Sequence, residues 1–131
     1  MEESEELLAT LVTQSPRPPM VTVALPDEQV QAALLIWARS TQAGGGWRAG
    51  VCYLHRTWYS QALVTTWAPA VRVSPHPAAR YHQVPRIHLD GDPAQWPALP
   101  PRYPGADQRW NAAHQHLPYG ASPHPRPGRA R

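Results

Sequence analysis

The sequence of 131 residues contains no lysine and no phenylalanine, and cysteine occurs in it once, as Cys52. A single cysteine excludes an intramolecular disulfide bond. Long apolar runs are also missing, and none approaches the roughly 18 residues that a membrane-spanning helix requires. The acidic start, residues 1–6, differs from the basic and then apolar pattern of a secretion signal. We therefore expect a cytoplasmic protein without a membrane span.

Signatures of catalysis are missing as well. The sequence has no nucleophile elbow, no phosphate-binding loop and no dinucleotide-binding fingerprint. Its seven histidines lack the spacing of zinc ligands, and an enzyme would require His114 and His116 to converge with nearby aspartates. Cys52 lies in an apolar run, where a buried and inert thiol is expected, and His55 would point to the opposite face of a strand. We predict no catalytic residue, no cofactor and no metal site.

Positive charge is supplied by arginine alone. All twelve cationic side chains are arginines, and four of the nine acids lie within the first six residues. From Leu7 onward, twelve arginines stand against five acids, a net charge of +7. Such biases are typical of a GC-rich genome, so the excess has a compositional explanation. It also suits a polyanionic partner such as nucleic acid, because guanidinium groups bind phosphate in a bidentate way.

Segments rich in β-forming residues recur about every ten residues between Met20 and Pro75. Alternation of apolar and polar residues predicts strands at 21–25 and 47–53. Enrichment in β-forming residues predicts another strand at 61–67, and 71–73 is predicted to be a short final strand. Residues 30–39 fit two structures. Local rules slightly favour a helix with Asp27 as its N-cap, whereas apolar side chains on both faces are typical of a buried central strand. The spacing predicts a small all-β barrel or sandwich.

The two ends of the chain differ from this central part. Residues 1–19 are predicted to form an acidic helical leader and a proline-containing linker, with leucines and a valine at helical spacing. Thirteen of the seventeen prolines follow Trp67. We expect residues 76–131 to be a proline- and arginine-rich, largely unstructured tail with a candidate helix at 107–117. Where this tail lies on the barrel, its anchors would be Tyr81, Val84, Ile87 and Leu89.

Short motifs between Val21 and Arg86 resemble those of short uncharacterised streptomycete (actinobacterial) proteins. The matching segments are Leu25-Pro26-Asp27, Trp37-Ala38-Arg39, Gly45-Gly46-Trp47, Trp67-Ala68-Pro69-Ala70 and Tyr81-His82-Gln83-Val84-Pro85-Arg86. The resemblance implies a five-stranded Src-homology-3-like barrel, in which a short turn precedes the last strand, and it favours the strand for residues 30–39. Some relatives are carried on plasmids and other mobile elements. The resemblance brings no catalytic residues.

The candidate binding site is the segment His55-Arg56-Thr57-Trp58-Tyr59, with Arg48 as a flanking cation. Aromatic rings stack on nucleic-acid bases while arginines hold phosphates, so this cluster predicts a platform for DNA or RNA. In the alternative interpretation, Trp58 or Tyr59 folds back to plug the end of the barrel. We predict a non-enzymatic binding module, an accessory protein of an actinobacterial mobile element in plasmid maintenance or transfer. The rival is a protein–protein adaptor that uses the aromatic loop or the proline-rich tail.

Overall fold

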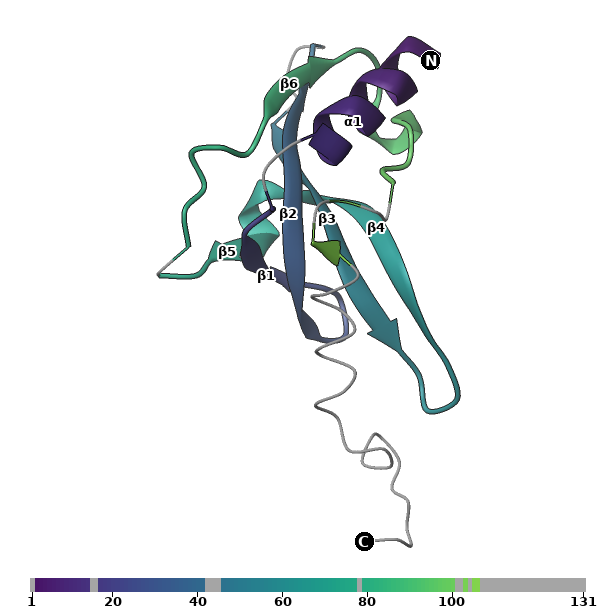
Figure 1. Cartoon of the computed structure of the whole chain (residues 1–131), viewed down its shortest axis with the longest axis vertical. Coiled ribbons are helices and arrows are strands. Elements are labelled where there is room, and N and C mark those ends of the chain that lie inside the picture. Colours follow the sequence, from purple (N-terminus) through teal and green to yellow (C-terminus); the bar gives the residue numbers. More distant parts are fainter. Residues whose placement is uncertain are drawn as a thin grey trace, which may run out of the picture.

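The structure, a computed structural model, describes residues 2–14, 17–41, 46–77, 79–100, 103, 105 and 106. These residues form one helix and one six-stranded sheet (Figure 1). The elements are α1 (Glu2–Gln14), β1 (Met20–Ala24), β2 (Gln29–Ser40), β3 (Trp47–Arg56), β4 (Gln61–Pro69), β5 (Val73–Pro75) and β6 (Arg86–Leu89), with 3₁₀ turns η1 (Ala70–Arg72) and η2 (Pro93–Gln95). The mainly β prediction and the N-terminal helix are confirmed. The candidate helix at 107–117 lies outside the described residues.

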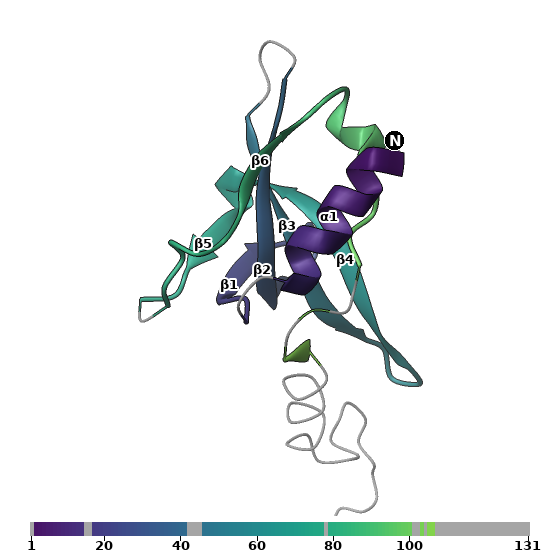
Figure 2. The same cartoon turned by 45° about the horizontal axis from the view of Figure 1, so that its top comes forward.

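The sheet is organised around the long central strand β2. The strand order β4-β3-β2-β1-β5 is antiparallel throughout, whereas β6 pairs with β2 in parallel. Residues 29–33 of β2 pair with β1, and residues 37–40 pair with β6, on the edge opposite β3. One edge of β2 is therefore shared by two strands from distant parts of the sequence, and Figure 2 shows β6 beside the upper part of β2.

Residues 30–39 form a strand, so the helix that local rules favoured is wrong. All five side chains from Ala32 to Ile36 are buried, as expected for a strand covered on both faces. The register shifts between Leu34 and Ile36, which makes Leu35 the extra residue of a β-bulge. Leu35 and Ile36 both pack on the face of the sheet that α1 covers, the helix face. Burial on two faces outweighs the weak local preference for a helix.

The predicted barrel does not close. In the described residues β4 and β5 stand at opposite ends of the strand order and do not pair with each other. Strand β5, which corresponds to the last strand of the predicted barrel, begins at Val73. This is two residues later than expected, because Val71 lies in η1. Strand β5 ends after three residues at Pro75, which cannot donate a ladder hydrogen bond. Helix α1 together with Trp96, Leu99, Tyr103 and Ala106 buries the helix face instead of a closing strand.

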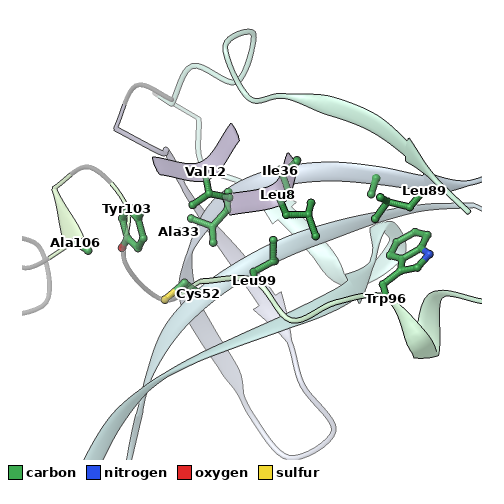
Figure 3. Close-up of a cluster of buried hydrophobic side chains, with 12 residues drawn as sticks. Leu8, Val12, Ala33, Ile36, Cys52, Leu89, Trp96, Leu99, Tyr103 and Ala106 are labelled. Atoms are coloured by element: carbon green, nitrogen blue, oxygen red, sulfur yellow. The ribbon is translucent and has the colours of Figure 1, made fainter. Parts of the chain in front are cut away.

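The sheet separates two hydrophobic clusters, one on each face. On the helix face, Leu8 and Val12 of α1 pack with buried residues of β2, β3 and the C-terminal segment (Figure 3). On the opposite face, Val23, Leu34 and Val51 are buried among β1, β2 and β3. The two packed faces hold β2 and β3 rigid, so that the hairpin made by β3 and β4 extends from a fixed base.

Residues that the sequence assigned to the tail contribute to both clusters. Of the expected anchors, Val84 and Leu89 are buried, and Ile87 packs on the helix face. The Tyr81 hydroxyl donates to the Met20 carbonyl oxygen at 2.8 Å. Three further buried residues that were not expected pack on the helix face: Trp96, Leu99 and Tyr103 (Figure 3).

Candidate binding site at the β3–β4 hairpin

Strands β3 and β4 stay in register up to the last pair before their turn. His55 pairs with Ala62, and Arg56 pairs with Gln61. Nothing between residues 47 and 69 carries a negative charge, and the hairpin contains Arg48, Arg56 and His55 as its basic residues. In Figure 1 the turn of this hairpin projects well beyond the rest of the sheet. The hairpin therefore presents a positively charged tip away from the core.

The turn is held by the hydroxyl group of Thr57. The Thr57 N–H group donates to the Ser60 carbonyl oxygen at 2.8 Å, and the Ser60 N–H group donates to Thr57 Oγ1 at 3.1 Å. Primed two-residue turns require positive φ angles, and no non-glycine residue in the described part of the chain has one. The Thr57 side chain thus supplies an acceptor that fixes a turn of ordinary backbone geometry.

Trp58 and Tyr59 occupy the two central positions of this turn. They are 75% and 76% exposed, respectively. Their ring centroids lie 5.6 Å apart at an interplanar angle of 86°, an edge-to-face contact. The alternative in which one of them folds back as a plug is therefore wrong. Two large aromatic side chains therefore face solvent and contact each other.

His55 and Arg56 are the last two residues of β3 before the turn, and their side chains lie on opposite faces of the hairpin. Both side chains are exposed. Strand alternation places His55 on the face of Tyr53, and Arg56 on the face of Leu54. The structure therefore brings together His55, Arg56, Trp58 and Tyr59, four of the five residues proposed from the sequence.

Arg48 is the fifth, and it lies at the other end of β3. It pairs with Ala38 of β2 and Pro69 of β4. Arg56 follows eight positions later, which corresponds to about 26 Å along an extended strand. Arg48 is not a neighbour of the hairpin tip.

Near that other end, the structure assembles residues that the sequence analysis did not group. Arg39 pairs with Trp47 on one side and with His88 on the other. The rings of Trp47 and His88 lie 5.7 Å apart. The sequence signal is a two-residue spacing, Trp37 to Arg39 and Arg86 to His88, which puts each pair on one strand face. The parallel pairing that joins them could not be inferred from spacing alone.

The described residues hold no group of three or more histidine, cysteine or acidic side chains that could bind a metal ion. Cys52 is fully buried on the helix face, while His55 points to the opposite face. His114 and His116 lie outside the described residues. No helix in the described ranges is long and apolar enough to cross a membrane.

The chain matches no known protein family, and no similar curated protein or solved structure was found. Geometry and charge are therefore the basis for assigning a function.

Proposed function

We propose that this protein is a non-enzymatic module that binds nucleic acid through the tip of the β3–β4 hairpin. Trp58 and Tyr59 stack on bases, while Arg56 and His55 contact the phosphate backbone. The observation that carries this proposal is the exposure of three quarters of both aromatic side chains on an ordered turn. Among the described residues this apolar area has no packing role, and exposed aromatic surface marks interaction sites.

Charge favours nucleic acid over a protein as the partner. Tryptophan, tyrosine and arginine are also the residues most enriched at protein–protein hot spots, so an adaptor role is the rival. The acid-free hairpin and the net charge of +7 from Leu7 onward complement a polyanion. An adaptor would need no such charge.

The connection between β4 and β5 supports a proposal about the fold type. The 3₁₀ turn η1 leads directly from β4 into β5, and β5 pairs back onto β1. A short turn before the last strand is what the resemblance to streptomycete proteins implies. We propose a Src-homology-3-like arrangement that has remained open, in an accessory protein of a mobile element.

Replacing Trp58 with alanine is expected to weaken binding of a labelled single-stranded oligonucleotide by about tenfold, since stacking contributes about 1–3 kcal/mol per base. Arg56→Ala is expected to lower the slope of log affinity against log salt by about 0.7, the value for one phosphate contact. Fluorescence anisotropy of the full chain at several salt concentrations measures both effects.

Arg17→Ala is the matched control for Arg56→Ala, because Arg17 is also exposed and lies in the linker before β1. It should change the affinity much less than Arg56→Ala does. Binding that survives intact in the Trp58→Ala/Arg56→Ala double variant would refute the hairpin site. Absence of any binding by the wild-type protein at low salt would leave the adaptor as the better proposal.

A further inference from the structure

A second group of aromatic and basic side chains lies at the far end of the sheet from the hairpin tip. It consists of Trp37 and Arg39 of β2, Trp47 of β3, and Arg86 and His88 of β6, and we call it the strand-end platform. The register forms two rows across the three strands. One row is His88, Arg39 and Trp47, and the next is Arg86, Trp37 and Ala49.

The side chains of the platform share one face of the sheet. Trp37 packs with the cluster on the face opposite α1, while its neighbour Ala38 packs on the helix face. Arg39 therefore points to the same face as Trp37, because side chains alternate along a strand. The contact between the Trp47 and His88 rings, which pair with Arg39 from opposite sides, confirms this placement.

The parallel strand β6 is fixed against β2 at both ends. The Trp37 N–H group donates to the Pro85 carbonyl oxygen at 2.8 Å, and the Thr41 N–H group donates to the Leu89 carbonyl oxygen at 2.9 Å. These bonds hold the two platform residues of β6 beside those of β2. The platform is thus built on paired strands rather than on a loop.

Burial and charge indicate what this surface can bind. Trp37 and Trp47 are half-buried, whereas Arg39, Arg86 and His88 are exposed. The ring of Trp37 is held by the cluster it packs on, and that of Trp47 lies against His88. Fixed rings lose little side-chain entropy when a ligand stacks on them. The nearest carboxylate along β6 is Asp90, which follows the strand and accepts a hydrogen bond from Thr41 Oγ1 at 2.9 Å. Indole rings beside two guanidinium groups suit a ligand with both aromatic faces and negative charges.

We propose that the strand-end platform binds single-stranded nucleic acid, with bases stacked on Trp47 and Trp37 and phosphates held by Arg39 and Arg86. Single strands fit because their bases are free to stack on a sheet surface, whereas duplex bases already stack on each other. This inference shares the partner class of the proposed function but rests on a separate surface. The hairpin tip also stacks bases and therefore also favours single strands; the platform adds a second surface with the same preference.

The test uses the full chain and two labelled probes, an oligothymidine strand of about 15 nucleotides and a duplex of the same length. A uridine strand of that length tests whether RNA is preferred to DNA. Arg39→Gln/Arg86→Gln is expected to lower single-strand affinity about tenfold and duplex affinity less than about threefold. Arg17→Gln/Arg80→Gln is the matched control, since it removes two exposed arginines that line a small cavity beside α1 instead.

Two further variants test the platform without removing arginines. Asp90→Asn keeps a hydrogen-bond acceptor for Thr41 and removes a negative charge near His88, so it should tighten single-strand binding. Trp47→Leu should weaken single-strand binding, with circular dichroism confirming that the variant folds.

The outcomes separate this inference from the proposed function. If platform variants bind single strands as well as wild type while Trp58→Ala/Arg56→Ala does not, the inference is overturned and the hairpin site stands. If Trp58→Ala/Arg56→Ala binds single strands as well as wild type while the platform variants do not, the platform stands and the hairpin site is overturned. Failure of wild type to bind any probe at low salt would overturn both.

Discussion

Replacing Trp96 with alanine is expected to lower the free energy of unfolding by about 3–5 kcal/mol, the cost of deleting a large buried aromatic side chain. Trp96 is 7% exposed and packs edge-to-face on Trp67, with ring centroids 5.0 Å apart. It lies in the proline-rich part of the chain, where the sequence predicts little packing. Chemical denaturation of the full-length variant measures the loss, a large fraction of an ordinary domain's stability of about 5–15 kcal/mol.

Trp58→Ala is the matched control for Trp96→Ala, because the same side chain is removed from an exposed turn. Its effect on stability should stay within about 0.5 kcal/mol. Trp96→Phe should be milder than Trp96→Ala, since the Trp96 Nε1–H group has no hydrogen-bond partner among the described residues. Equal stability of Trp96→Ala and wild type would show that Trp96 does not belong to the core.

Gly50→Val is expected to destabilise the protein by about 3 kcal/mol, at the upper end of the cost of overpacking a core. A Cβ atom at Gly50 would lie 2.8 Å from Ile36 Cγ2 and 3.1 Å from Trp67 Cζ3, and it would also collide with Leu99 Cδ1. Glycine is needed here because Leu99 approaches the backbone of β3 directly.

Leu99 cannot easily move away, because its segment is bonded to β4. Thr65 Oγ1 donates to the Leu99 carbonyl oxygen at 3.0 Å, and Trp67 Nε1 donates to the Pro97 carbonyl oxygen at 3.1 Å. Gly46→Val is the matched control, since a Cβ atom there meets nothing within 4 Å. Thermal and urea denaturation should show little change for Gly46→Val. A stable Gly50→Val variant would contradict the close packing of Leu99 on the sheet.

Local sequence patterns were enough to predict β3 and β4, because these strands pair with each other in a hairpin of neighbouring residues. For β2, the apolar run from Ala32 to Ile36 satisfies both a buried helix and a buried strand. The choice depends on whether other segments cover two faces of it. Helix α1 and Leu99 cover one face and Val84 packs on the other, and the positions of these segments are not encoded in the local pattern.

The open sheet and the packed C-terminal segment could not be predicted either, because the local pattern of that segment does not indicate packing. Proline removes backbone donors and lowers the expectation of a strand, yet Pro85 precedes β6 and Pro97 accepts a side-chain hydrogen bond from Trp67. Isolated apolar residues such as Trp96, Leu99 and Tyr103 carry no periodicity that would mark them as core. They cover the helix face of the sheet, where a closed barrel would have needed none of them.

For the candidate site too, the sequence could identify only residues that are neighbours along the chain. His55, Arg56, Trp58 and Tyr59 are consecutive or nearly so, and a hairpin turn keeps them together. Arg48 is close to them in sequence but about 26 Å away along an extended strand. The strand-end platform joins residues of β2, β3 and β6, and its parallel pairing joins residues that lie 49 positions apart in a chain of 131 residues. Such long-range pairings leave no local signal.

The most direct test of nucleic-acid binding at the hairpin is photo-crosslinking of the full chain to an iodouridine-substituted single strand, with mass spectrometric mapping of the tryptic peptides. Peptide 57–72 contains Trp58 and Tyr59, and peptide 40–48 contains Trp47. We expect crosslinks at Trp58 or Tyr59 in the first peptide, and at Trp47 in the second if the platform binds. Crosslinks found only at aromatic residues beyond residue 106, such as Trp110 or Tyr119, would contradict binding at the hairpin.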